Sequence, residues 1–374
     1  MSPGPELTFA CELDPARLAG LFADDSVIGD LLALGARVAL MVSDFSDERA
    51  EVVRRLNTAG VPVVGIPLLP LAQGYYFTAD NAAQAAGRYQ QWQAWTRGHR
   101  LAWAGVGLDV EPDARIYLQI MDSPWGLAPM LLPRLFDRAR PERSRTAYRE
   151  LVDRIRADGW TVENYQFPLI ADERRAGSTL LQRLALVDVQ TDREVWMIYS
   201  SFMRALGPGL IWSYGPEAAA IGVGTTGGGP DIPGSPQMPS LTWEEFARDL
   251  RLARHWCDQI LIHSLEGCVW QGFLGRLRSF DWTDTATSPE RAWAAGGLRT
   301  CLRAALRASA YPWAMLGAAT ASCCLIRLRV GSSRSPTLDR SPGSHAGSWQ
   351  DQRPGRVPLS ATERGPCTAG TAGI

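Results

Sequence analysis

The stretch Gly105-Val106-Gly107-Leu108-Asp109-Val110-Glu111-Pro112 has the pattern of one strand of a parallel β-barrel. Successive side chains of a strand point to opposite faces, so the two glycines, Asp109 and Glu111 share one face. The apolar residues share the other face, which suits the layer between a sheet and its helices. We therefore expect both carboxylates to point into the barrel mouth. The alternative is that Glu111 caps the next helix or pairs with Arg115.

Short apolar runs alternate with helical patterns on both sides of this stretch, from residue 6 to about 280. Such alternation is typical of a parallel sheet covered by helices. Eight strand–helix units of this total length predict a (β/α)8 TIM barrel. An open doubly wound sheet is the alternative, but no Gly-x-Gly-x-x-Gly follows the first strand. The predicted strands are residues 7–13, 37–42, 63–68, 104–110, 160–165, 194–200, 219–225 and 259–265.

The chain changes character after the predicted barrel, residues 1–285. We expect residues 286–374, rich in Arg, Ser, Pro and Gly, to form a tail of low order, because they offer little apolar surface to bury. Residues 308–326 carry no charge and approach the length of a membrane span, although their small residues make them weakly apolar. The N-terminus has no signal-peptide pattern. A cytoplasmic protein is expected, with C-terminal membrane anchoring as the alternative.

Composition excludes several kinds of chemistry. All 38 basic residues are Arg, so the chain has neither a Schiff-base lysine nor a P-loop lysine. The net charge of −1 gives no field to attract nucleic acid. We expect no cofactor, and no metal site because the histidines are widely separated in sequence. They are His99, His255, His263 and His345.

The strand at 104–110 resembles the signature of the family 18 chitinase-like glycoside hydrolases, Asp-Gly-x-Asp-x-Asp-x-Glu. Gly105, Asp109 and Glu111 match the glycine, the last aspartate and the catalytic glutamate. Ala104 and Gly107 replace the two earlier aspartates. The match therefore keeps two of the four acids of that signature.

A second strand carries the same resemblance. Met197-Ile198-Tyr199-Ser200 is similar to that family's Met-x-Tyr-Asp, with Ser200 in place of the aspartate. The resemblance implies a carbohydrate substrate and a proton transfer from Glu111 to the leaving oxygen. It further implies that Asp109 orients a substrate acetamido group and that Tyr199 assists it. The absence of the two other aspartates weakens the carboxylate pairing that adjusts the pKa of Asp109 in that family.

A second carboxylate is expected near the end of the last strand. If Ile260 and Ile262 face inward, Glu266 follows them to the mouth, and His263 becomes a packing residue on the opposite face. Glu111 and Glu266 then form the acid and nucleophile or base pair of ordinary glycosidases. Other strands also carry acids that can replace the missing ones. These are Glu12, Asp44 and Glu163.

Aromatic and amide side chains near the predicted strand ends suit a sugar, because rings stack on its apolar faces and amides bond its hydroxyls. The expected substrate-binding residues are Tyr75, Tyr76, Asn164, Gln166 and Trp270.

The Gly-rich run at 222–229 supports a different hypothesis. Loops after the seventh and eighth strands bind phosphate in phosphosugar barrels, so a phosphosugar-binding enzyme is an alternative. The run continues into a long Pro- and Gly-containing loop without a cluster of basic residues, which favours a simple connection. A third alternative is a catalytically degenerate barrel that binds a glycan or a partner.

Overall fold

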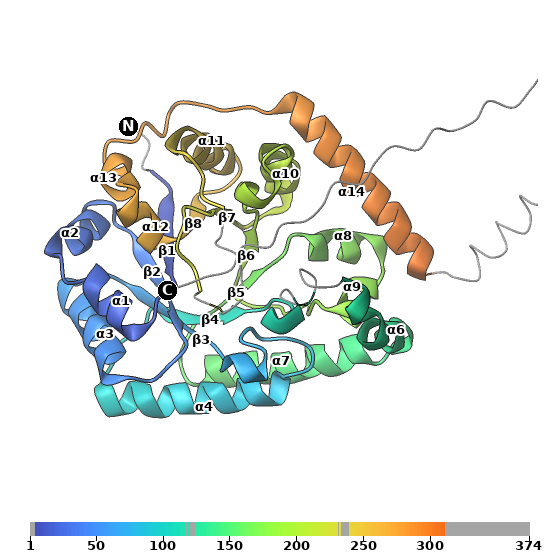
Figure 1. Cartoon of the computed structure of the whole chain (residues 1–374), viewed down its shortest axis with the longest axis horizontal. Coiled ribbons are helices and arrows are strands. Elements are labelled where there is room, and N and C mark those ends of the chain that lie inside the picture. The colour runs from blue at the N-terminus through green and yellow to red at the C-terminus, as the bar shows by residue number, and fades with distance from the viewer. Residues whose placement is uncertain (1–3, 117–118, 120–123, 231, 233–238, 311–374) are drawn as a thin grey trace, which may run out of the picture. The chain divides into compact units, whose positions relative to one another are not determined.

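A computed structural model describes residues 4–116, 119, 124–230, 232 and 239–310 of the 374-residue chain. Eight parallel strands form a closed barrel in the order β1 to β8, with helices arranged around it (Figure 1). The predicted TIM barrel is confirmed. The strands are β1 (Glu6–Cys11), β2 (Arg37–Val42), β3 (Val63–Pro67), β4 (Gly105–Asp109), β5 (Val162–Gln166), β6 (Arg193–Met197), β7 (Ala220–Gly224) and β8 (Gln259–His263).

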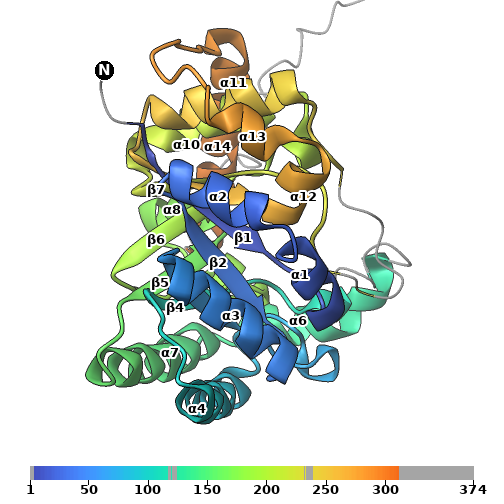
Figure 2. The same ribbon diagram turned by 90° about the vertical axis from the view of Figure 1, so that its left-hand side faces the viewer.

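The helices begin and end at residues that favour these positions. Asp14 caps α1 by accepting from the Arg17 amide, and the predicted capping box of Thr242 and Glu245 starts α11. Gly60 ends α3 with a φ of 85°. Helices α1, α2 and α3 cover β1 and β2 (Figure 2). The described helices are α1 (Pro15–Leu21), α2 (Asp25–Ala33), α3 (Asp47–Ala59), α4 (Ala82–His99), α6 (Ala128–Phe136), α7 (Arg140–Ala157), α8 (Leu169–Ala176), α9 (Leu180–Leu184), α10 (Gly207–Tyr214), α11 (Trp243–Arg254), α12 (Leu265–Trp270), α13 (Phe273–Leu277) and α14 (Pro289–Ala310).

Apolar side chains form two separate clusters, one on each face of the barrel wall. The outer cluster lies between strands and helices and includes Ile260 and Ile262. The inner cluster fills the barrel and includes Leu261. A side chain at Gly107 has no room inside, because a Cβ there would lie 2.6 Å from Ile66 Cγ1 and 2.7 Å from Tyr165 Cε2. The glycine therefore permits two large neighbours to fill the interior.

An ionic cluster closes the N-terminal end of the barrel. Arg37 donates to Glu163 at 2.6 Å and to Glu6 at 2.9 Å. Arg193 also pairs with Glu6, at 3.1 Å. The Tyr165 hydroxyl donates to the second oxygen of Glu163 at 2.9 Å. Glu163 is therefore bound at the N-terminal end of the barrel, opposite to the mouth formed by the C-terminal ends of the strands.

The ordered chain continues beyond the predicted boundary at residue 285. Helix α14 packs on α8 and α10 (orange in Figure 1). Its Arg299 is 4% exposed and donates to the fully buried Asp172 of α8. The expectation of low order from residue 286 is thus wrong for residues 289–310, because their arginines pair with acids far away in sequence. The expectation for residues 311–374 lies outside the described residues.

No helix in the described part of the chain is long and apolar enough to cross a bilayer. Most of the uncharged segment 308–326 lies outside the described residues.

Candidate functional site

Polar side chains gather at the C-terminal ends of the strands, where active sites of such barrels lie. They come from β1, the loop after β3, β4, the end of β6 and β8. Hydrogen bonds, ion pairs and mutual electrostatic effects connect them. We call this group the mouth cluster; it consists of Glu12, Tyr75, Tyr76, Asp109, Glu111, Tyr199 and His263.

Asp109 is the last residue of β4 and is 4% exposed. Its pKa lies well above the ordinary value because of burial, with further increases from the negative charges of Glu111 and Glu12. A side-chain hydrogen bond with Glu111 acts in the same direction. Its buried Oδ1 has no hydrogen-bond partner among the described residues. Asp109 is therefore suited to hold a proton next to Glu111.

Glu111 lies two residues beyond β4 and is half-buried. The Val110 amide donates to the Tyr165 carbonyl at 3.1 Å, so the strand pairing extends past Asp109. This extension keeps Glu111 on the same face as Asp109, and their hydrogen bond agrees with that placement. The predicted sharing of one face by the two acids is thus present in the structure.

Glu12 follows β1 and is 6% exposed. The Tyr75 hydroxyl donates to its Oε1 at 2.8 Å. The other oxygen, Oε2, lies 3.7 Å from His263 Nε2. Oε1 therefore accepts a hydrogen bond, and Oε2 lies at ion-pair distance from the imidazole when the latter is protonated.

His263 points into the barrel and not toward the helices. Its ring centroid lies 5.3 Å from that of Tyr199, and its Nδ1 is buried without a described partner. Burial opposes the charged imidazole, but the nearby carboxylate of Glu12 and the charges of other glutamates raise the pKa above its ordinary value. The expected inward placement of Ile260 and Ile262 is wrong, because both lie in the outer cluster.

Three tyrosines complete the mouth cluster. Burial raises the pKa of Tyr75, Tyr76 and Tyr199, and the charges of Glu12 and Asp109 raise each of them further. Their hydroxyls therefore remain protonated donors. Tyr75 and Tyr76 pack edge to face with centroids 5.0 Å apart. Tyr75 has a φ of 66°, which is uncommon for a residue other than glycine and often occurs at functional sites.

Glu266 lies in the first turn of α12 and is fully buried. Its Oε1 accepts from the Gly229 amide at 2.9 Å, and its Oε2 has no described partner. Burial raises its pKa, against the opposing effect of His263. Glu266 is thus bound to the Gly-rich loop, close enough to act electrostatically on His263. The Gly229 amide is engaged by this carboxylate, which weakens the hypothesis of a phosphate site in the loop.

The other expected substrate-binding residues lie apart from the mouth cluster. Asn164 donates to the Val189 carbonyl at 2.7 Å and Gln166 donates to Glu194. Both alternate with the inward-facing Tyr165 along β5, so they face the surrounding helices and loops. Trp270 ends α12 with 58% of its surface exposed.

Two further acidic or motif positions have structural partners. Asp44 accepts from Arg49 at 2.6 Å and from the Ser46 hydroxyl at 2.5 Å. The Ser200 hydroxyl donates to the buried carboxylate of Asp249 on α11. Neither is part of the mouth cluster. Glu12, one of the acids that the sequence offers in place of the missing aspartates, belongs to it.

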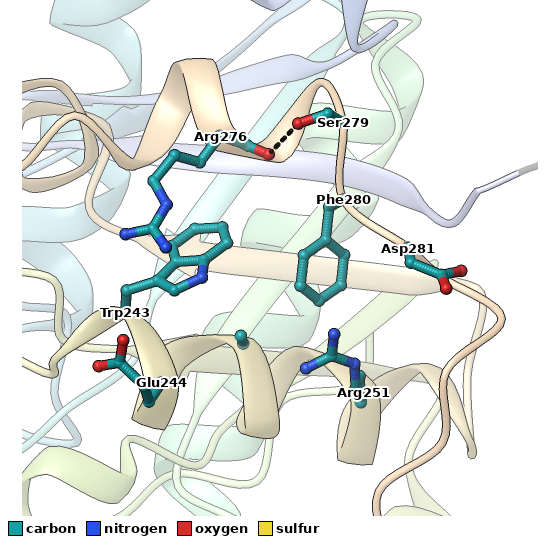
Figure 3. A pocket seen from close by; sticks show the side chains of 8 residues that line it. Trp243, Glu244, Arg251, Arg276, Ser279, Phe280 and Asp281 are labelled. Atoms are coloured by element: carbon teal, nitrogen blue, oxygen red, sulfur yellow. Dashed lines mark hydrogen bonds between the residues drawn. The ribbon is translucent and has the colours of Figure 1, made fainter.

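A cavity of about 530 Å³ opens on the side of the barrel between α11 and α13 (Figure 3). Arg276 Cζ lies 4.0 Å from the centroid of the Trp243 ring, and Arg251 Cζ lies 4.7 Å from that of Phe280. Arg251 also pairs with Asp284 at 3.0 Å. These guanidinium groups cover the aromatic rings, so we place the site at the mouth cluster instead. Within the described residues, no group of three or more His, Cys, Asp or Glu has an arrangement that could hold a metal ion.

Comparisons with known proteins concern the fold alone. A GH18 chitinase from Pseudoalteromonas aurantia is 10% identical, with a TM-score of 0.44, and the match covers 74% of this chain and 100% of that one. An AP endonuclease, family 2, from Brucella melitensis is 13% identical, with a TM-score of 0.40, covering 72% and 98%. No protein-family model matches the sequence. No curated protein sequence matches it significantly.

Proposed function

We propose that this barrel is a glycoside hydrolase in which Glu111 is the general acid and Asp109 its partner. The observation that best supports this proposal is Asp109, which is buried at the C-terminal mouth on the same face as Glu111 and has a strongly raised pKa. Two carboxylates that share a proton provide the protonated acid that glycoside cleavage requires at neutral pH.

The reaction begins with a sugar bound among the tyrosine hydroxyls of the mouth cluster. Glu111, which is half-buried, gives its proton to the leaving oxygen as the bond to the anomeric carbon breaks. The shared proton lies on Glu111 at this step, and Asp109 is the carboxylate partner that returns a proton to Glu111 between turnovers. The resemblance to the chitinase-like family supports a sugar bearing an N-acetyl group, which Asp109 and Tyr199 would orient.

Buried polar atoms without partners support a polar ligand at this position. The Oδ1 of Asp109 and the Nδ1 of His263 both lie buried in the mouth cluster with no described hydrogen-bond partner. Unpaired buried polar atoms are costly, and native structures keep few of them without a functional reason. Sugar hydroxyls offer both donors and acceptors and would satisfy these two atoms.

A glycan-binding barrel without turnover is the second candidate. One signature aspartate of the chitinase-like family corresponds to Gly107, and Ile66 and Tyr165 fill the space that its side chain would need. The pairing of two aspartates that adjusts the pKa of the corresponding aspartate in that family is therefore replaced here by apolar packing. In this case the mouth cluster would bind a sugar and leave its bonds intact.

The test measures hydrolysis of 4-methylumbelliferyl glycosides, in both anomers, of neutral hexoses, pentoses and N-acetylhexosamines. We expect turnover of at least one, and E111Q should lower kcat/KM by about 10²- to 10⁴-fold for the methyl glycoside of the same sugar, whose leaving oxygen needs a proton. Glu150, an exposed residue of α7, provides the control E150Q with unchanged activity. Full activity of E111Q on the methyl glycoside would exclude the proposed acid. Calorimetric binding of a glycan without any turnover would favour the second candidate.

A further inference from the structure

A hydrolytic barrel needs a second carboxylate besides its acid. Glu266, expected from the sequence, is fully buried and bound to the Gly229 amide. Glu163 is bound to Arg37 at the opposite end of the barrel. Among the described carboxylates outside the Asp109–Glu111 pair, Glu12 is the one that belongs to the mouth cluster.

The surroundings of Glu12 fix its position on two sides. Tyr75 donates to Oε1 at 2.8 Å, and His263 Nε2 lies 3.7 Å from Oε2. The negative charge of Glu12 acts on Asp109, Tyr76 and Tyr199, so its carboxylate lies close to the group that would bind the sugar.

We propose that Glu12 is the second catalytic carboxylate, acting as general base, and that His263 is its positioning residue. This inference rests on the proposed glycoside hydrolase function. Each carboxylate oxygen has two lone pairs, so Glu12 can accept a proton from water while both of its partners remain in place.

The step conserves all atoms and electrons. The oxygen of one water attacks the anomeric carbon while the bond from this carbon to the leaving oxygen breaks. Glu111 protonates the leaving oxygen, and Glu12 takes one proton from the attacking water. One water is consumed, and the products are a hemiacetal and an alcohol. Attack opposite to the leaving group inverts the anomeric configuration.

The test uses the full-length protein and the best 4-methylumbelliferyl glycoside of the panel. We expect E12Q to lower kcat/KM by about 10²- to 10⁴-fold, and added sodium azide to restore turnover of Glu12→Ala. Proton NMR of the fresh product should show inversion. The matched control is E163Q, because Glu163 also faces inward and accepts from a tyrosine, Tyr165, at 2.9 Å. Its kcat/KM for folded protein should stay unchanged.

His263 is tested by H263Q and H263N, which keep one polar group but carry no charge. A positioning role predicts a lower kcat with an unchanged KM and a loss of activity that sodium azide does not restore. If E12Q does not fold, E12D retains the carboxylate one methylene further back and should still lose kcat while unfolding like the wild type.

The outcomes separate the two proposals. Full turnover by E12Q, together with loss of activity of E111Q on the methyl glycoside, overturns the role of Glu12 alone. Retention of configuration in the product also overturns the base role and leaves the acid role intact. A wild-type protein that hydrolyses no member of the panel overturns both.

Discussion

The Tyr75 hydroxyl donates a 2.8 Å hydrogen bond to Glu12, which joins the loop after β3 to the end of β1. Tyr75 and Glu12 are 63 positions apart in the sequence, so this hydrogen bond connects distant segments of the chain across the barrel mouth. Tyr75 also has a φ of 66°, a backbone conformation that is uncommon for a residue other than glycine. The mouth cluster is thus held by contacts that no single strand could provide.

Removal of this bond should destabilise the fold. We expect Y75F to lower the free energy of unfolding by about 1.5–3 kcal/mol, the range for hydrogen bonds to charged groups. Urea unfolding followed by tryptophan fluorescence measures the change. The control is Y199F, because no hydrogen bond of the Tyr199 hydroxyl is described, and it should unfold within about 0.5 kcal/mol of the wild type. Equal losses in the two variants would contradict the role of the Tyr75–Glu12 bond.

Asp109 should make stability depend on pH. Its pKa in the fold is raised above the ordinary value of 3.8, so the folded state favours the protonated form. The stability that this provides is complete below the unfolded pKa and is lost as pH rises through the folded pKa. D109N cannot ionise, so its stability relative to the wild type should increase with pH over this window. Urea unfolding at several pH values measures it, and a constant difference would argue against the raised pKa.

The ion pair of His263 and Glu12 should be visible by NMR, because the chain has only four histidines. The His263 pKa is raised, so the imidazolium persists above the ordinary value and is lost as pH rises through the folded pKa. We expect E12Q to lower the pH at which the His263 ring signals titrate. The H263Q spectrum assigns these signals, and an unchanged titration in E12Q would show that the two residues do not interact.

Much of the fold could be predicted from the sequence, because strand runs and helix patterns alternate regularly. Strand β2 has the predicted bounds, Arg37–Val42, and the shared face of Asp109 and Glu111 follows directly from alternation. Which side chains of β8 point into the barrel could not be predicted in this way. Ile260, Leu261 and Ile262 are all apolar and are buried on both faces, so their pattern has no inward side.

Two other features depend on contacts distant in sequence. Alternation along β8 ends at His263, and α12 begins at Leu265, so it cannot place Glu266. Helix α14 resembled a solvated basic tail because its acid partners, Asp172 and Glu217, lie far back in the chain. Neither the start of α12 nor the ion pairs of α14 can be recognised from the residues next to them in the sequence.

The buried pair of Arg299 and Asp172 should attach α14 to the barrel. Arg299 Nη2 lies 2.9 Å from a carboxylate oxygen of Asp172, whose side chain is fully buried. R299A removes one of the two arginines that pair with this carboxylate, since Arg303 Nε remains 2.7 Å from it, and we expect a loss of about 1.5–3 kcal/mol in the free energy of unfolding. The exposed Arg307 of the same helix provides the control R307A, which should change it by less than about 0.5 kcal/mol. Similar effects of the two substitutions would contradict this attachment.

The tight packing of the barrel interior should require a glycine at position 107. A Cβ at this position would lie 2.6 Å from Ile66 Cγ1 and 2.7 Å from Tyr165 Cε2, so G107A should cost about 1–3 kcal/mol of stability through overpacking. The same substitution at Gly87 of α4 meets no atom within 4 Å and should stabilise the helix by up to about 1 kcal/mol.

A double-mutant cycle with Ile66→Ala tests the cause of the cost at Gly107. Removal of the Ile66 side chain opens the space that the new methyl group needs, so the two substitutions together should cost less than their sum by about 0.5–3 kcal/mol. Urea unfolding of the four proteins measures the coupling. Strict additivity would show that backbone freedom at Gly107, and not the packing of Ile66 into the barrel, explains the glycine.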